Sequence, residues 1–224
     1  MAVWNSIYSD SLADGMRLDG EYYSPKYQRI LTNLSRGKVI GDVADLSKRQ
    51  FTPVAGTPFR YIQIGDVRRD GYAEPEERDG SDAPSRAQWV VKHGDVITST
   101  VRPIRCLTAI IEADQDGCVC SSGFAVLTPR AGAEGIEPEV LSTYLRLPVI
   151  CEILDLHTTA SMYPAIAVDR LMRIPIVVPD TKTRKAIVAT VQEPVATRRH
   201  SLELLEKAKK TVEDLIAGEP RRKI

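Results

Sequence analysis

The segment HTTASMY, residues 157–163, gathers an imidazole, three hydroxyls and a phenol into one short stretch. These groups donate and accept hydrogen bonds, and an imidazole can also act as a general acid or base. Catalysis would need these groups to belong to a recognised catalytic motif, whereas binding would not. The other two histidines, His93 and His200, stand isolated and are expected at the surface. The segment therefore favours binding over catalysis unless a catalytic motif occurs elsewhere.

Catalytic and nucleotide-binding motifs do not occur in this sequence. It has no GxxxxGK[ST] phosphate loop, no GxGxxG turn after a strand, and no HExxH, GxSxG or HxE…CxxC pattern. The Asn/Asp-Pro-Pro-aromatic tetrapeptide expected of a methyltransferase acting on base amino groups is also absent. Pro179-Asp180 could begin a nuclease motif, but the chain that follows is predicted to be helix instead of the required strand. We therefore expect a protein that is not an enzyme and has no cofactor of its own.

The four cysteines, Cys106, Cys118, Cys120 and Cys151, are expected to be reduced thiols. Cys118 and Cys120 share one face of a predicted strand, but no second cysteine pair and no neighbouring histidine completes a metal site, so no metal is expected. The start, MAVWNSIYSD, lacks the basic and apolar parts of a secretory signal. No apolar run approaches the roughly 18 residues of a membrane span. We therefore expect a cytoplasmic protein without membrane contact.

The charge balance limits how this protein could hold a nucleic acid. Lys and Arg together number 30, and so do Asp and Glu, so the formal net charge is zero. A protein that binds DNA through phosphate contacts alone would be basic overall. Any nucleic-acid site must therefore be a local patch, or a partner must supply much of the positive charge.

Short strands are predicted throughout the region from Val39 to Pro129. Turn signals such as Gly65-Asp66 and Gly94-Asp95 separate alternating or β-branched runs. These runs lie at residues 60–64, 89–91, 95–101, 107–111 and 124–127. The acidic residues 74–85, EPEERDGSDAPS, are expected to form a mobile surface loop.

Helical patterns flank the β-rich region on both sides. Ser24 is a suitable N-cap and Pro25 suits the first helical position, so a helix is predicted from there to Gly37. Residues 138–157 carry a broad apolar face at helical spacing, and residues 165–172 predict a short helix before a proline-bounded strand at 174–179. The fold class is therefore α+β: a β-rich domain with flanking helices.

One long helix is predicted after Pro179, over residues 181–217 and about 55 Å in length. A helix of that length cannot pack entirely on a domain of this size, so its apolar stripe predicts coiled-coil-like contact with a second chain. Pro194 inside it predicts a kink or a short break. The residues expected at the dimer or partner interface are Val188, Val191, Val195, Leu202, Leu205, Val212 and Ile216.

The order of these segments resembles the DNA-specificity (S) subunits of type I restriction-modification systems. In that family two strands are associated with Gly-Asp turns, a proline-bounded strand closes the target recognition domain, and a long helix follows. The matching segments are RLDGEYYSPKY at 17–27, YIQIGDV at 61–67, KHGDVITST at 92–100 and LMRIPIVVP at 171–179. The resemblance spans roughly residues 17–216, although Asp180-Thr181 stands where the family usually has an acidic residue and Gln.

The resemblance implies a division into four parts. These are an N-terminal segment and helix packing on the domain at 1–37, a target recognition domain at 38–180, a spacer and dimerisation helix at 181–217, and a frayed tail at 218–224. The family usually has two recognition domains and two long helices, so this chain resembles a half-length form that reads one half-site. A second copy of the chain, or another half-length specificity chain, would complete it.

The resemblance also implies what this protein would work with. It would bind double-stranded DNA and dock a methyltransferase (M) subunit, which would hold S-adenosylmethionine and carry out DNA methylation. A motor-nuclease (R) subunit is a further partner that the resemblance allows, in a system for defence against foreign DNA.

The resemblance and the residue types together predict DNA contacts at three turns. Arg and Lys suit guanine, Gln suits adenine, and hydroxyls suit base edges or phosphates. The family carries a small polar loop at the place of residues 157–163. The predicted residues are Lys48, Arg49, Gln50, Arg60 and Gln63 around the first turn, Thr98, Thr100, Arg102 and Arg105 at the second, and His157, Thr158, Thr159, Ser161, Met162 and Tyr163 at the third.

Each turn also has an interpretation without DNA. The first would be a solvated turn, and the two arginines of the second would pair with Asp95 or Glu112. The hydroxyls of the third would cap the helix that follows, Tyr163 would lie in the core, and the long helix would fold back on its own domain. Two other functions correspond to these interpretations: a protein-interaction adaptor without sequence-specific DNA binding, and a fragment of a fused methyltransferase-recognition enzyme.

Overall fold

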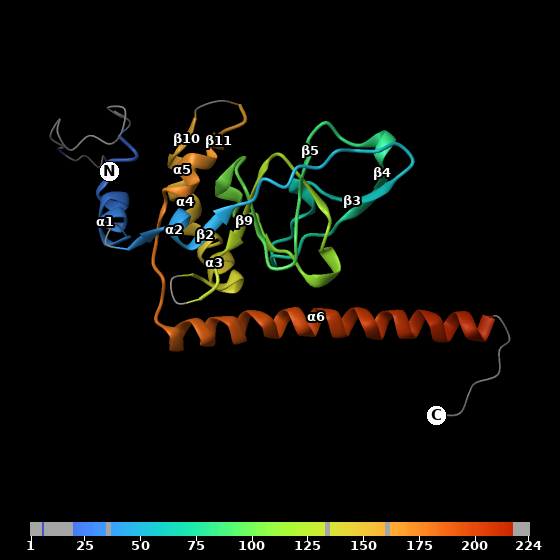
Figure 1. The fold of residues 1–224 in the computed structure, drawn as a ribbon. Coiled ribbons are helices and arrows are strands. Elements are labelled where there is room, and N and C mark those ends of the chain that lie inside the picture. The colour runs from blue at the N-terminus through green and yellow to red at the C-terminus, as the bar shows by residue number, and fades with distance from the viewer. Residues whose placement is uncertain (1–5, 7–19, 35–36, 133–134, 160–161, 217–224) are drawn as a thin grey trace. The chain divides into compact units, whose positions relative to one another are not determined.

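The computed structural model describes residues 6, 20–34, 37–132, 135–159 and 162–216 of the 224-residue chain. The chain divides into two compact units, Met1–Pro179 and Asp180–Ile224. The first contains all the strands, and the second contains one helix (Figure 1). The functional division of the chain into the four parts named above stays a prediction, and the tail at 218–224 lies outside the described residues.

A four-stranded antiparallel sheet is built around the fully buried strand β6 (Val96–Ser99). Its order is β2 (Ala44–Leu46), β9 (Phe124–Pro129), β6 and β7 (Thr108–Ile110). In the register, Val96 faces Leu127 on one side and Ile110 on the other. Gly94, with a φ of 85°, forms the predicted turn that leads the chain into β6.

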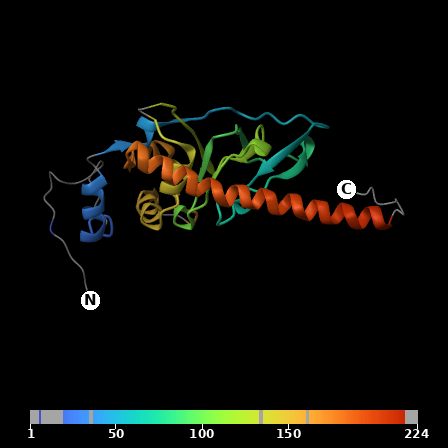
Figure 2. The ribbon, with the colours of Figure 1, turned by 90° about the horizontal axis from the view of Figure 1, so that it is seen from below.

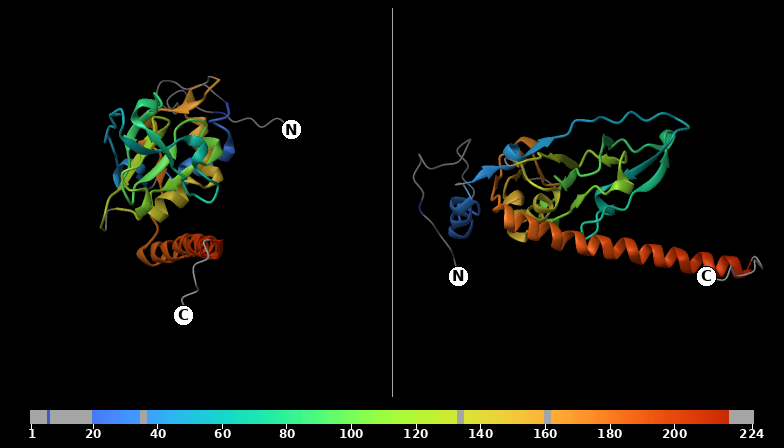
Figure 3. Two further views of the ribbon diagram at one scale, coloured as in Figure 1. Left: turned by 90° about the vertical axis from the view of Figure 1, so that its right-hand side faces the viewer. Right: turned by 60° about the horizontal axis from the view of Figure 1, so that its bottom comes forward.

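A second four-stranded sheet has the order β4 (Glu76–Asp79), β3 (Pro58–Ile62), β8 (Val119–Ser121) and β5 (Ala87–Val90). β3 and β8 run parallel, whereas the other pairs are antiparallel. The chain reaches β3 through an extended crossing from β2, on which Gln50 faces Trp89 of β5 (Figure 3). β4 lies within the acidic segment 74–85, so the prediction of a mobile loop there was wrong. Its backbone pairs with β3, from Tyr61↔Glu76 to Pro58↔Asp79.

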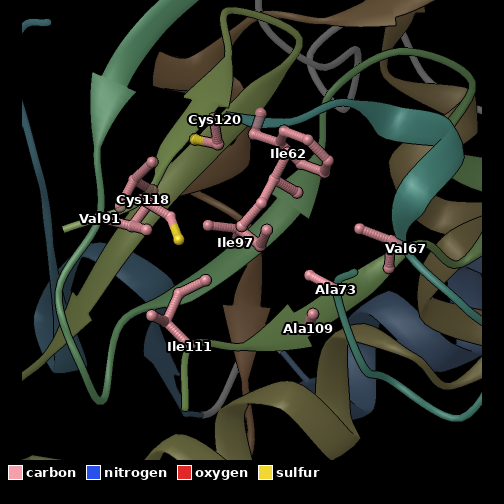
Figure 4. Packing of buried hydrophobic residues seen from close by; sticks show 11 residues of the cluster. Ile62, Val67, Ala73, Val91, Ile97, Ala109, Ile111, Cys118 and Cys120 are labelled. Atoms are coloured by element: carbon pink, nitrogen blue, oxygen red, sulfur yellow. The ribbon is translucent and has the colours of Figure 1, made fainter. Parts of the chain in front are cut away.

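The two sheets share one hydrophobic core. Ile62, Cys118 and Cys120 enter it from the second sheet, and Ile97 and Ala109 enter it from the first (Figure 4). Each of these residues is at most 2% exposed. Burying a side chain of the size of isoleucine stabilises a fold by about 1.5–3 kcal/mol, so the core holds the sheets, and the turns between their strands, in a fixed arrangement.

Burial of the cysteines leads to a prediction about their reactivity. Burial raises the pKa of the Cys118, Cys120 and Cys151 thiols, and contact with Cys106 contributes at Cys151. The reactive thiolate is therefore scarce at these positions, and access to it is blocked. We expect an aromatic disulfide reagent to modify Cys106 first in the native protein, and all four cysteines only after unfolding. Mass spectrometry would count the modified sites, and Cys106→Ser should remove the fast one; rapid labelling of Cys118 or Cys120 would contradict the prediction.

Helices cover the first unit, and they differ in part from the prediction. The single helix predicted at 138–157 is two, α3 (Pro138–Leu145) and α4 (Pro148–Leu156), because Leu147 is extended and Pro148 starts a new helix. α1 (Pro25–Leu34) begins at the predicted residue and is joined to α4 by the Lys26 Nζ–Glu152 ion pair at 2.5 Å. Residues 35–36, before the predicted stop at Gly37, lie outside the described residues. The described residues also form four single-turn 3₁₀ helices: η2 (Ile64–Asp66), η3 (Gly80–Asp82), η4 (Pro103–Arg105) and η5 (Ala113–Gln115).

The N-terminal and C-terminal edges of the first unit are paired. β1 (Lys38–Val39), which leads into α2 (Ile40–Val43), is antiparallel to β12 (Pro175–Ile176). β12 is shorter than the strand predicted at 174–179. The helix predicted at 165–172 is also shorter: it is α5 (Val168–Met172), preceded by the strand β11 (Ala165–Ile166), because Ala167 between them is extended.

The second unit is the helix α6 (Thr181–Ile216), whose 36 residues give a length of about 54 Å. It continues without a break through Pro194 (Figures 1 and 2), so of the predicted kink or short break, the break was wrong. Asp180 caps its start: the carboxylate accepts from Lys182 N at 2.9 Å and from Thr183 Oγ1 at 2.7 Å, and these bonds lower the pKa of Asp180.

The predicted α+β class with a long C-terminal helix is confirmed. Among the described residues, none of the helices combines the length and the apolar character that crossing a membrane requires.

Candidate nucleic-acid interface

Two of the three predicted turns lie together in the structure. β10 (Thr158–Thr159) pairs with β11 to form a hairpin (Figure 1). Val101, two residues after the end of β6, faces Ala165 of this hairpin. Arg102 N donates to Pro164 O at 2.8 Å, and Ile166 N donates to Thr100 O at 2.9 Å. These backbone bonds join the hairpin to the chain that leaves β6, so residues about 60 positions apart in the sequence share one surface.

Arg102 contacts the tip of the hairpin through its side chain. Its Nη2 donates to Met162 O at 3.2 Å, and its guanidinium carbon lies 5.5 Å from the centroid of the Tyr163 ring. A guanidinium at that distance is attracted to the negative face of the ring. Tyr163 is therefore not a core residue: it is 69% exposed, and Met162 beside it is 84% exposed.

The turn that carries Arg102 has an unusual backbone. Arg102 and Cys106 have φ values of 49° and 54°, in the left-handed region, and they flank η4 on both sides. Non-glycine residues adopt this region at a cost, and they cluster at binding and catalytic sites. The turn exposes Ile104 and Arg105 to solvent. We call Arg102, Ile104, Arg105, Met162 and Tyr163 the Arg102–Tyr163 surface.

The two arginines of this surface do not pair with the carboxylates suggested by the sequence. Among the described residues, neither Arg102 nor Arg105 forms an ion pair, and Asp95 is paired with Arg49 instead. The Arg102–Tyr163 surface therefore presents two guanidinium groups beside three exposed apolar side chains.

Arg49 of the first predicted turn has a structural position. Its Nη2 donates to Asp95, which is 2% exposed and also accepts from Lys92 N and Thr128 Oγ1, both at 2.8 Å. Asp95 precedes β6 whereas Thr100 follows it, so the two lie about 16 Å apart along the strand. Arg49 is thus at the other end of β6 from the Arg102–Tyr163 surface.

The Arg49–Asp95 pair gives a stability prediction. Replacing Arg49 by Met leaves a buried carboxylate with two donors in place of three, so the free energy of unfolding should fall by about 2 kcal/mol. The loss is smaller than for a fully buried pair because the Arg49 side chain is 31% exposed. Urea unfolding would measure it. Arg130→Met, which breaks the exposed Arg130–Asp45 pair, is the matched control and should change stability much less; equal effects would contradict the assignment.

Several of the predicted hydroxyls and the histidine also bond within the protein. Thr100 Oγ1 is buried and donates to Gly123 O at 2.9 Å, and Thr98 Oγ1 lies 2.7 Å from Thr108 Oγ1. Thr158 Oγ1 donates to Asp155 O at 2.7 Å, at the end of α4. His157 follows α4 with its ring edge against Tyr22, 5.4 Å between centroids. Thr159 is exposed, and Ser161 lies outside the described residues.

The remaining predicted contacts lie near the second sheet. Lys48 and Gln50 are exposed on the crossing segment before β3. Arg60 on β3 donates to Asp114 O, and Gln63 Nε2 donates to Asp66 Oδ1 at 3.3 Å. Both side chains remain at the surface. No group of three or more His, Cys, Asp or Glu residues that could hold a metal ion occurs in the described part of the chain.

Comparison with known proteins gives a consistent result, although no protein-family model matches the sequence. The HindI type I restriction enzyme specificity subunit of Haemophilus influenzae is 26% identical over 151 residues, which are 66% of this chain and 32% of that subunit. A chain from a type I restriction-modification system, solved in work on complex assembly and conformational transition, matches with a TM-score of 0.60 and 32% identity. The HsdS subunit of Thermoanaerobacter tengcongensis matches with a TM-score of 0.57 and 31% identity.

This chain is similar to specificity subunits of type I restriction-modification systems. The resemblance predicted from the sequence is thereby confirmed. Both structural matches cover 79% of this chain but only 46% of the solved chain. The chain therefore spans about half the length of the two solved chains and about a third of the curated subunit.

Ile104 is the member of the surface that the sequence analysis missed. It stands between Pro103 and Arg105, and an apolar residue in that place is as compatible with a core as with a surface. The run Arg-Pro-Ile-Arg was still a usable signal, because two cations and a proline interrupt a predicted strand there.

Proposed function

We propose that this chain is a DNA-recognition subunit that reads one half-site through the Arg102–Tyr163 surface. The observation that supports this most is the joining of Arg102, Arg105 and Tyr163 from distant parts of the sequence on one strained, exposed surface. Guanidinium groups suit guanine edges and phosphates, and an exposed phenol suits base contact. The relatedness to specificity subunits supports the same function and does not favour a protein-binding adaptor without DNA recognition.

The other predicted residues divide into two groups. Lys48, Gln50, Arg60 and Gln63 are exposed, so they enter the proposal as contacts to phosphates or flanking bases. Arg49, Thr98 and Thr100 are left out, because their side-chain bonds hold the sheets together. Thr158 bonds to the end of α4, the preceding helix, and the N-cap of α5 is Ala167 without a side-chain bond, so the predicted capping of the following helix was wrong for Thr158.

The proposal extends to partners. The chain itself would be non-catalytic, and a methyltransferase subunit would dock on it, supply S-adenosylmethionine and methylate the DNA. Two copies, or two half-length specificity chains, would pair through α6, so that a two-fold dimer reads two inverted half-sites. A motor-nuclease subunit would join when the DNA is cut. The zero net charge of the chain is compatible with this division, because the partner would supply further phosphate contacts.

Selection from a pool of random duplexes tests the proposed function. The chain, purified together with its methyltransferase partner, should enrich a defined sequence of two parts and protect it from nuclease digestion. The complex should still retain the selected duplex at moderate salt, where non-specific binding to DNA falls steeply. Equal retention of all duplexes would overturn the proposal.

A further inference from the structure

The tip of the hairpin exposes apolar side chains to an unusual extent. Met162 is 84% exposed, Tyr163 is 69% exposed, and Ile104 on the adjacent turn is 50% exposed. Apolar surface is unfavourable in water, and a group of such side chains on one surface marks a place that a partner covers. These three side chains therefore need an occupant with apolar faces.

The backbone beneath these side chains is fixed before any partner binds. Arg102 N is bonded to Pro164 O at 2.8 Å, Val101 is bridged to Ala165, and Arg102 and Cys106 are held at positive φ. The Arg102 guanidinium is also bonded to Met162 O, the carbonyl next to Tyr163. A backbone that is already held in place loses less entropy on binding. The bonds accepted by Met162 O and Pro164 O and the contact of the Tyr163 ring with Arg102 thus preorganise the segment that carries these side chains.

The charges indicate which occupant has the required faces. Arg102 and Arg105 place positive charge beside the apolar tip, and in the described part of the chain no carboxylate neutralises either through an ion pair. A DNA base step combines apolar base faces with a phosphate on each strand. Proteins that bend DNA insert Met, Ile or similar side chains between base pairs and hold the flanking backbone with Arg.

We propose, on the basis of the proposed function, that Met162 and Tyr163 form a wedge that enters between two adjacent base pairs of the bound half-site. Ile104 supports the wedge, and the guanidinium groups of Arg102 and Arg105 hold the edge of the groove. Separating two base pairs costs least at a pyrimidine–purine step. The half-site therefore contains such a step, and part of its specificity arises from deformability instead of hydrogen bonds to bases.

Fluorescence of 2-aminopurine tests the wedge, because this base brightens when it is unstacked. The probe is placed at each position in turn of the selected duplex, bound to the full chain with its methyltransferase partner. We expect a rise at one pyrimidine–purine step, separate from any rise at the base that is methylated. Met162→Ala with Tyr163→Ala should abolish the rise at that step and weaken binding about 10-fold. Met162→Leu with Tyr163→Phe should keep both the fluorescence rise at that step and the binding affinity.

Matched controls separate the possible outcomes. Val54 and Leu147 are exposed apolar residues elsewhere, at 60% and 41%, and Val54→Ala and Leu147→Ala should leave the signal unchanged. If the complex is sequence-specific but 2-aminopurine fluorescence rises only at the methylated base, the wedge is overturned and the proposed function stands. Failure to select any sequence would overturn both. Loss of the methyltransferase subunit in the double alanine variant, with DNA stacking unchanged, would assign the tip to protein docking and would also overturn the wedge.

Discussion

Replacing Arg102 by Ala should weaken binding to the selected sequence by about 1–3 kcal/mol, which is roughly a 5- to 150-fold rise in Kd. Arg102 is half-buried as a residue, and its guanidinium is bonded to the exposed hairpin tip and has no ion-pair partner among the described residues, so its charge is available to DNA. The change also removes the contact with the Tyr163 ring, 5.5 Å away, and so loosens the tip. A binding titration at several salt concentrations would measure the effect.

The pattern of the loss distinguishes a base contact from a phosphate contact. If Arg102 reads a guanine, repeated selection with the variant should relax the preference at one position. If it binds a phosphate, all sequences should weaken equally and the salt slope should fall by about one. Arg68→Ala is the matched control, because this exposed arginine pairs with Asp70 and lies outside the Arg102–Tyr163 surface. Unchanged affinity in Arg102→Ala, or an equal loss in Arg68→Ala, would refute the proposed role.

Replacing Leu202 and Leu205 by Glu should convert a dimer of this chain into monomers. The two leucines are 52% and 56% exposed, and they belong to a stripe of α6 that continues to Val212 and Ile216. Four carboxylates at the seam between two helices would have to leave water without partners, which costs more than the seam gains. Light scattering coupled to gel filtration would report the mass.

Leu204 provides the control for the dimer prediction. It is 53% exposed, close to the value for Leu202, but it lies two residues from Leu202 and so projects from a different side of the helix. Leu204→Glu should leave the mass of the dimer unchanged. If the double variant has the same mass as the wild type, α6 is not the dimer interface; if the wild type is already monomeric, the partner of the stripe is another chain.

The strands could be predicted where local signals were strong. Gly94-Asp95 marked the start of β6 correctly, because a glycine at positive φ and a carboxylate that accepts from a backbone N–H both act within a few residues. β4 was missed because its four residues, Glu76–Asp79, are all charged, and their strand conformation depends on pairing with β3. Pro148 also signals a new helix start, but the helical apolar spacing continues on both sides of Leu147 and so predicts one helix.

The composition of the candidate site could not be predicted from the sequence, because it depends on distant contacts. Nothing local indicates that Asp95 pairs with Arg49, 46 residues away, instead of Arg102 or Arg105. The positive φ of Arg102 depends on the hairpin 60 residues later, to which its backbone is bonded. Residue types therefore predicted which turns could bind DNA. Long-range pairing determined which of their side chains remain available for binding.

The pairing of β1 with β12 has a consequence for how such proteins can change. Lys38 faces Ile176 and Val39 faces Pro175, so the two ends of the segment 40–174 meet at one place. Everything between these two short strands, including both four-stranded sheets and the Arg102–Tyr163 surface, is inserted at a single joint. A recombination event that exchanged residues 40–174 for those of a relative would need to restore this joint and the contacts of Tyr22 and Lys26 with α4 and the residue after it. New sequence preferences could then be acquired in one genetic step, while the helix that follows stays unaltered.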